Sequence, residues 1–236
     1  IGLGYGEVKK VKPDIIMVSL SLQGQTGPHA KQAGFGTELQ ALAGFTNLAG
    51  WPDRPPVAMS VPYTDFIVPW YALVAIIAAI EHRDRTGEGQ YIDISQLEAG
   101  PLFLSLPILD YLINHRQIHR MGNRCPYAAP HGIYRCQGED RWCAIAVFSD
   151  AHWQAFRKVM GDPPWAQEER FGTLLHRKQN EEELDQLVEQ WTMGQEAGDI
   201  MTKLQQAGVP AGIVATGADL YADPQLKHRG HFRVLN

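Results

Sequence analysis

An apolar run without a charged side chain covers residues 66–80 and directly follows a single acidic residue, Asp65. Such a segment favours a buried environment, and it ends in the charged letters EHRDR after fewer residues than a membrane span needs. We therefore expect a buried helix that starts just after Asp65 and ends at TGEG. Asp65 then lies at the N-terminal end of an apolar helix.

Asp65 has two candidate roles at such a helix start. The first is structural, because an Asp before an apolar-periodic stretch is typically the N-cap, whose oxygen accepts otherwise unpaired backbone N–H groups. The second is chemical, because the helix dipole and backbone donors would hold an ionised carboxylate in place while apolar neighbours exclude water. Spacing alone favours the structural role, since capping aspartates far outnumber nucleophilic ones.

Strand and helix patterns alternate through the first part of the chain. A β-branched run over 14–20 predicts a strand buried on both faces, and 90–95 predicts another strand. Helical spacing covers 37–48 and 96–115, the second helix being disturbed by two prolines. The fold class is therefore α/β with a largely parallel sheet, and residues 1–120 form part of a large domain.

Composition changes near Arg120, after which a second set of elements is expected. Two short strands around a turn at 137–141 predict a β-hairpin, and Gly208 should end a helix before an extended stretch. Residues 121–216 then form a small α+β domain, and 217–236 return toward the large domain. Helices of the small domain are expected over 151–160, 181–192 and 196–207.

Charge and cysteine content limit the function classes. A formal net charge of −5 with interspersed acids and bases offers no basic surface for nucleic acid. Cys125, Cys136 and Cys143 make neither a zinc pattern nor an even disulfide framework, and a reducing cytoplasm fits them best. Cys136 and Cys143 are expected to fill the core as small apolar residues. We expect a cytoplasmic protein without a metal site, a nucleic-acid partner or a membrane partner.

The segment GNRCPYAAPHG, residues 122–132, combines small residues with backbone N–H groups. Such a loop can close over a reacting carbonyl and donate hydrogen bonds to an oxyanion. A plain interdomain connection is at least as well supported by composition. The candidate residues for the oxyanion or lid role are Gly122, Asn123, Tyr127, Ala128, Ala129, His131 and Gly132.

Six segments, in this order, resemble the class III CoA-transferase family of CaiB/BaiF type. They read KPDIIMVSLSLQGQTGP, AGFGTELQALAG, HRDRTGEGQYIDIS, GNRCPYAAPHGIYRC, LQQAGVPAGIV and DPQLKHRG. The family includes formyl-CoA transferase, carnitine CoA-transferase and α-methylacyl-CoA racemase. The resemblance implies a Rossmann-like CoA-binding domain and a smaller domain in an interlocked homodimer. It also implies that the N-terminal part of the large domain lies outside this chain.

In the transferases the nucleophile is an Asp at a helix start, and that position falls on Asp65. The resemblance implies that its carboxylate attacks the thioester of a donor acyl-CoA, giving a mixed anhydride and CoA thiolate. The thiolate then forms an aspartyl-CoA thioester, and an acceptor carboxylate runs the steps in reverse. Coenzyme A is thus a substrate rather than a permanently bound cofactor. The implied partners are an acyl-CoA and a small carboxylate.

The resemblance also suggests further site residues. The family's glycine-rich lid falls on the 122–132 loop, although PYAAP replaces its run of consecutive glycines. Weaker matches make Gln25, Gly27, Phe35 and Tyr63 candidate contacts for substrate or CoA. Tyr and Trp at such positions are as often core residues as ligand contacts.

Two other functions are compatible with the sequence. The racemases pair the equivalent Asp with a His on the opposite face of the α-carbon. Here the His position is Phe35, which cannot move a proton, and a further racemase Glu falls near Ser149. Both departures favour CoA transfer over an acyl-CoA racemase or isomerase. The other alternative is a noncatalytic relative in which Asp65 only caps a helix. The sequence specifies neither the donor nor the acceptor acid.

Overall fold

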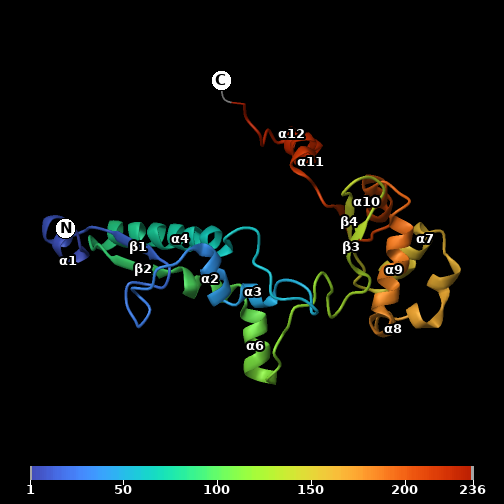
Figure 1. Cartoon of the computed structure of the whole chain (residues 1–236). Coiled ribbons are helices and arrows are strands. Elements are labelled where there is room, and N and C mark those ends of the chain that lie inside the picture. Colours follow the sequence, from blue (N-terminus) through green and yellow to red (C-terminus); the bar gives the residue numbers. More distant parts are fainter. Residues whose placement is uncertain (1, 235–236) are drawn as a thin grey trace. The chain divides into compact units, whose positions relative to one another are not determined.

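A computed structural model describes residues 2–234, and the contacts within the chain divide it into two units, 1–122 and 123–236 (Figure 1). Each unit mixes helices with strands, as the sequence predicts for an α/β chain. The predicted return of residues 217–236 to the first domain stays a prediction.

The first unit is built around two parallel strands and one long helix. β1 pairs with β2 from Met17↔Tyr91 to Ser21↔Ser95. The long helix α4 contacts both strands as well as α2 and α5 (Figure 1). The elements of the first unit are α1 (Tyr5–Val11), β1 (Met17–Ser21), α2 (Gly36–Leu42), α3 (Phe45–Leu48), α4 (Tyr63–Thr86), β2 (Tyr91–Ser95), α5 (Gln96–Leu102) and α6 (Ser105–Asn114).

β1 is more accessible than its sequence predicts. Every residue of the strand is at least partly exposed, and Leu20 is 44% exposed. The described sheet gives β1 a single partner strand, β2, so one edge and part of each face stay uncovered. The prediction of burial on both faces is wrong for the described chain.

α4 is longer and more exposed than expected. Its 24 residues make it long and apolar enough to cross a membrane by length and composition alone, a test that core helices of soluble proteins also pass. Only 28% of its most apolar window is buried. The predicted end of the helix at TGEG is confirmed, whereas the expectation that the helix is buried is wrong. Its exposed apolar side chains include Phe66, Trp70, Leu73, Val74 and Ile77.

Two predicted helices of the first unit are each divided in two. Gly44 takes a φ of +94° between α2 and α3, a left-handed conformation that glycine adopts readily. The second break falls between α5 and α6, at Phe103 and Leu104. Helix is thus found where it was predicted, but in shorter pieces.

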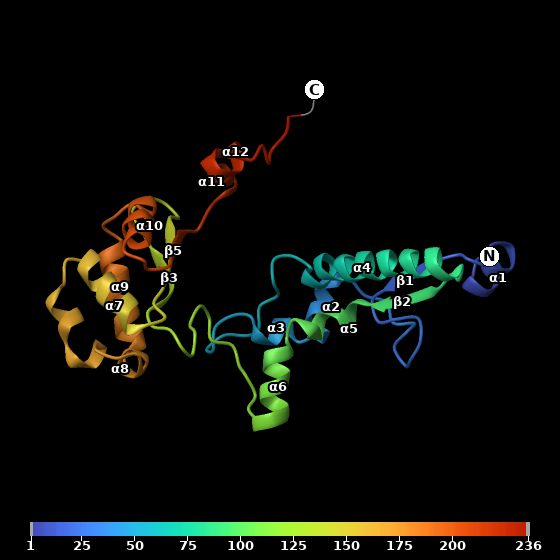
Figure 2. The same ribbon diagram turned by 180° about the vertical axis from the view of Figure 1, so that it is seen from behind.

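The second unit is a three-stranded antiparallel sheet covered by helices (Figure 2). The sheet order is β3-β4-β5, with His131↔Ala146 and Cys143↔Ile213 among the paired residues. Its strands are β3 (His131–Arg135), β4 (Trp142–Ala146) and β5 (Ala211–Ile213). Its helices are α7 (Asp150–Val159), η1 (Pro164–Gln167), η2 (Glu169–Phe171), α8 (Leu174–Gln179), α9 (Glu181–Thr192), α10 (Ala197–Gln206), α11 (Gly217–Ala222) and α12 (Pro224–His228).

The second unit has the larger core. Trp153, Phe156 and Phe171 are fully buried in one cluster with residues of β4, α9 and α10. Cys136 and Cys143 belong to this cluster as free thiols, which confirms their predicted role as core filler. The predicted hairpin and the three helices of this unit are confirmed in type and position.

Candidate active site

Asp65 is the third residue of α4 rather than its N-cap. The helix begins at Tyr63, and Pro62 occupies the N-cap position without a side-chain cap. The Asp65 N–H donates to the Pro62 carbonyl oxygen over 2.9 Å. The predicted capping role of Asp65 is therefore wrong, because the helix starts three residues earlier than the charge pattern suggests.

The Asp65 carboxylate has no structural partner within residues 2–234. In a capping box, the side chain of the third helical residue accepts from the N-cap N–H, but Pro62 has none to donate. No hydrogen bond or ion pair joins this carboxylate to another described residue. Its charge interacts favourably with the helix dipole, by about 0.3–1 kcal/mol at an exposed site. The side chain is accessible and available for chemistry.

Gly36, the first residue of α2, packs against this carboxylate. A Cβ on Gly36 would overlap Asp65 Oδ2 and lie 2.5 Å from Pro62 Cβ, so no larger residue fits without displacing one of them. The buried Thr64 hydroxyl donates to the Gly36 carbonyl oxygen over 3.4 Å. The first turn of α2 therefore borders one side of Asp65.

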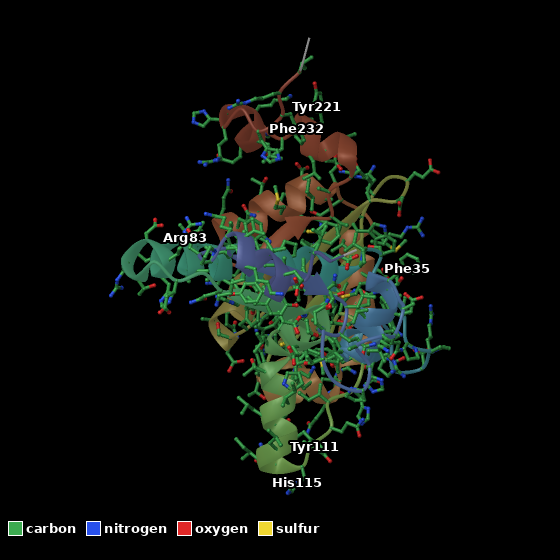
Figure 3. All side chains as sticks on the ribbon, turned by 90° about the vertical axis from the view of Figure 1, so that its left-hand side faces the viewer. Phe35, Arg83, Tyr111, His115, Tyr221 and Phe232 are labelled. Atoms are coloured by element: carbon green, nitrogen blue, oxygen red, sulfur yellow. The ribbon has the colours of Figure 1, made fainter. Side chains whose placement is uncertain are left out.

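The loop between β1 and α2 holds three of the other predicted residues. The Gln25 N–H donates to Asp93 Oδ2 over 2.9 Å, and Gly27 takes a φ of +90°. Phe35 precedes Gly36 at the N-cap of α2 and exposes 76% of its surface (Figure 3). The described contacts bring α2 to Asp65 but do not join Gln25 or Gly27 to it.

Tyr63 lies in an aromatic cluster of the first unit. Its ring meets Phe45 edge-on at 5.0 Å between centroids and Phe103 at 6.1 Å. Packing of this kind is typical of a core residue. The cluster explains why the α4 start is well held, whereas a substrate contact for Tyr63 stays a prediction.

Gly122 anchors the start of the 122–132 loop within the first unit. Its N–H donates to the Gly50 carbonyl oxygen over 2.9 Å, and its φ is +61°. A Cβ there would lie 3.2 Å from the Trp51 indole nitrogen. The Gly122 N–H is therefore already used and is not a free oxyanion donor in this conformation.

Ala128 and Ala129 are fully buried in the second unit. The Ala129 N–H donates to the Val147 carbonyl oxygen over 3.1 Å, and the Ala128 N–H donates to Cys125 over 3.4 Å. The backbone N–H groups of this loop are thus less available than composition suggested. Those of Asn123 and Tyr127 have no backbone acceptor among the described residues.

Two consecutive cations of α8 hold the carbonyl side of the same loop. Arg177 is fully buried and donates to the Ala129 carbonyl oxygen over 2.7 Å and to Asp150 over 3.0 Å. Lys178 donates to the Cys125 carbonyl oxygen over 2.8 Å. Burial lowers the pKa of Arg177, although Asp150 acts in the opposite direction. The loop is therefore fastened at two carbonyl groups.

A buried polar group extends this anchorage to α9. The Tyr134 hydroxyl donates to Asp185 over 2.7 Å, and Arg124 of the loop lies 3.2 Å from the same carboxylate. Burial raises the pKa of Asp185 and, with the Asp185 charge, raises that of Tyr134 well above its ordinary value. Tyr134 therefore stays a neutral donor. A Cβ on Gly132 would lie only 2.9 Å from the Tyr134 hydroxyl, so the lack of a side chain at Gly132 permits this packing.

The exposed side of the loop carries two aromatic residues. Tyr127 is 67% exposed and stacks on Phe148 at 6.4 Å, while His131 meets Phe148 edge-on at 5.9 Å. His131 Nδ1 is hydrogen-bonded to the Asn123 carbonyl oxygen. Hydrogen bonding to Cys125 raises the pKa of Tyr127. Ser149, which follows Phe148, caps α7 through its hydroxyl and supplies no carboxylate.

Several site-shaping residues escaped sequence reasoning. Gly36 and Gln40 contact the start of α4, and Arg177 and Lys178 contact the 122–132 loop. The glycine at the start of a predicted helix was a usable signal, whereas the burial of Gln40 and Arg177 depends on tertiary packing. Within the described residues no group of three His, Cys, Asp or Glu is arranged to hold a metal ion.

The chain matches known proteins over its whole length. The model of CoA-transferase family III covers residues 1–236. The succinyl-CoA–D-citramalate CoA-transferase of Chloroflexus aurantiacus is 32% identical over 94% of the chain and 55% of its own length. The succinate–glutarate CoA-transferase of Agrobacterium fabrum is 31% identical over 97% of the chain and 57% of its own length.

A solved structure agrees with the fold. A CaiB/BaiF family protein from Brucella suis superposes with a TM-score of 0.89 and 34% identity, over 97% of this chain and 60% of that one. This match confirms the predicted mixed α/β fold. The chain therefore spans little more than half the length of these relatives, and it belongs to CoA-transferase family III.

Proposed function

We propose that the full-length protein is a CoA-transferase that moves CoA from an acyl-CoA to a carboxylic acid through an aspartyl-CoA thioester on Asp65. Family membership supports the reaction class. The observation that carries the residue assignment is the accessible carboxylate in the first turn of α4, which has no partner among residues 2–234. We further propose a cytoplasmic homodimer.

The proposed chemistry transfers CoA from the donor to the acceptor acid in four balanced steps. The Asp65 carboxylate attacks the donor thioester and forms a mixed anhydride as the C–S bond breaks and CoA thiolate leaves. The thiolate attacks the Asp65 acyl carbon, releases the donor acid as a carboxylate and leaves Asp65 as a CoA thioester. The acceptor carboxylate then attacks that thioester, and the released thiolate takes the acceptor acyl group, which frees Asp65.

The names of the relatives suggest the substrate class. They include succinyl-CoA with D-citramalate and succinate with glutarate, all of which are small dicarboxylic acids or their thioesters. We propose succinyl-CoA as donor and a small dicarboxylate as acceptor. A panel of mono- and dicarboxylates with succinyl-CoA tests this, and a clear preference for monocarboxylates would contradict the acceptor class.

The assignment of Asp65 is tested in the full-length protein by Asp65→Asn and Asp65→Ala. We expect CoA transfer to fall by roughly 10³-fold or more, because no nucleophile is left. Unfolding free energy should change by no more than about 1 kcal/mol, since only the dipole interaction is lost. Asp84→Asn is the matched control, because Asp84 is an exposed Asp of the same helix.

Trapping identifies the covalent carrier directly. Hydroxylamine added during turnover should label Asp65, which mass spectrometry of the digested protein locates. A label on another residue, or parental activity in a folded Asp65→Ala variant, would contradict the mechanism. Exchange of the α-hydrogen with solvent in the absence of an acceptor would indicate a racemase or isomerase. If neither CoA transfer nor this exchange is observed, the protein is a noncatalytic relative.

A further inference from the structure

Gln40 of α2 has a fully buried amide side chain directly beneath the start of α4. It is 0% exposed and ranks among the largest fully buried side chains of the chain. Burial of an amide is unfavourable unless both of its ends are hydrogen-bonded. The partners of Gln40 therefore show what this side chain holds in place.

Both ends of the Gln40 amide bind the backbone that leads into α4. Its Oε1 accepts from the Tyr63 N–H over 3.3 Å, and its Nε2 donates to the Met59 carbonyl oxygen over 3.4 Å. A backbone N–H only donates and a carbonyl only accepts, so these partners admit a single orientation of the amide. Gln40 thus bridges the chain across the turn that precedes the helix.

The Tyr63 N–H belongs to the first turn of α4, where backbone N–H groups have no partner within the helix. Pro62 at the N-cap position offers no side-chain acceptor. Gln40, which is distant in sequence, therefore supplies an acceptor for one of the N–H groups that a helix start leaves unpaired. The helix start depends on α2 rather than on its own sequence.

α2 contacts three consecutive residues of α4. Gln40 binds Tyr63, the Gly36 carbonyl oxygen accepts from the Thr64 hydroxyl, and the Gly36 backbone packs against the Asp65 carboxylate. Gly36 and Gln40 lie four positions apart in α2, so they share one face of the helix. This face determines where the Asp65 side chain is held.

We propose that Gln40 is a positioning residue for Asp65, fixing the first turn of α4 so that the carboxylate points at the thioester carbonyl. The inference rests on the proposed function of Asp65. A nucleophile misplaced by a fraction of an ångström loses rate without losing binding. Gln40 touches no reacting atom and acts only through the α4 backbone.

The test compares Gln40→Met with the parent in the full-length protein. Met keeps the length and approximate volume of the side chain but removes both hydrogen bonds. With succinyl-CoA as donor in single-turnover experiments, we expect formation of the enzyme-bound thioester to slow roughly tenfold or more, with less than about a threefold change in donor KM. Amide exchange at Tyr63 should become faster.

Two further variants separate positioning from folding. Gln40→Glu keeps an acceptor for the Tyr63 N–H and should recover part of the rate. Gln96→Met is the matched control, because the Gln96 Oε1 is buried in the same unit without a partner among the described residues, and its rate should stay parental. Should Gln40→Met yield no folded protein, Gln40→Asn decides by the same rate measurement, because its amide is one methylene shorter and loses the reach to Tyr63 and Met59.

Distinct outcomes overturn the two proposals. A parental rate in folded Gln40→Met, or in Gln40→Asn where that variant decides, refutes the positioning role. The positioning role is also refuted if the rate of thioester formation declines only in proportion to the fraction of folded protein. If Asp65→Asn retains parental transfer, the proposed function fails whatever the Gln40 variants do.

Discussion

Pro62 determines what Asp65 is free to do. A carboxylate at the third position of a helix usually accepts from the N-cap N–H, but proline has no such hydrogen. The adjoining hydrogen bonds are made by others: Gln40 accepts from Tyr63, and the Pro62 carbonyl accepts from Asp65 itself. The side chain of Asp65 consequently has no structural role within the described part of the chain, although it lies at the N-terminus of α4, where the helix dipole stabilises a negative charge.

Cys143 illustrates a residue whose environment predicts a pH effect on stability. It is fully buried, and burial raises the pKa of its thiol to about 11. In the unfolded chain the thiol ionises near its ordinary pKa of about 8.5, so between these values the unfolded state has lost a proton that the folded state keeps. Stability therefore falls as the pH rises through this window.

Cys143→Ala isolates this effect. Between about pH 8 and about pH 10 the free energy of unfolding of the parent should fall by about 1–2 kcal/mol more than that of the variant. Denaturant titrations at a series of pH values measure the difference. Parallel curves for the two proteins would show that ionisation of this thiol does not contribute.

At the scale of elements, α8 joins the 122–132 loop to the core of the second unit. Arg177 and Lys178 each donate to one loop carbonyl, and Arg177 also lies over the Trp153 ring at 5.2 Å. Buried carbonyl groups are costly to leave without a donor. The short helix thus holds the loop by hydrogen bonds to main-chain oxygens, independently of the loop side chains.

Arg177→Met should destabilise the full-length protein by about 2–5 kcal/mol, because the Ala129 and Phe171 carbonyl groups lose their buried donor, whereas the exposed Asp150 carboxylate is solvated. Arg170→Met is the control, since Arg170 is partly exposed and pairs with Glu168 on the surface. Its cost should stay below about 1 kcal/mol. Equal destabilisation of both variants in urea unfolding would contradict the buried anchorage.

At the scale of the whole molecule, the two units differ in how much apolar surface they enclose. The buried cluster of the first unit contains Ala43, Phe45 and Ile67, whereas that of the second includes Trp153 and Phe156 together with residues of the sheet and of several helices. Exposed apolar residues also lie along α4 in the first unit. Local stability follows the density of buried contacts, so the units should open independently and unequally.

Hydrogen exchange measures this difference. In the 236-residue chain, amides of the β3–β4 pair should exchange more slowly than those of the β1–β2 pair, although all four strands contain five residues. Peptides covering the two strand pairs can be followed in one mass-spectrometry experiment. Equal or reversed protection would show that the smaller core of the first unit does not limit its stability.

The type of most elements was predictable because it depends on local periodicity. The hairpin around 137–141 and the helices α7, α9 and α10 follow from alternation and helical spacing in single segments. The start of α4 was predicted too late because its first turn is held by Gln40, which precedes it by more than twenty positions. Charge pattern alone cannot report a cap supplied from another helix.

Local chemistry in the chain specified its helices and strands, its family motifs and the acidic residue before the apolar run, since each of these is written in neighbouring positions. Only the tertiary structure decided that Asp65 does not cap α4, that Gly36 borders its carboxylate and that both N–H groups of residues 128–129 are hydrogen-bonded. These properties arise from contacts between segments distant in sequence, where burial and hydrogen-bond pairing, rather than periodicity, set the energy.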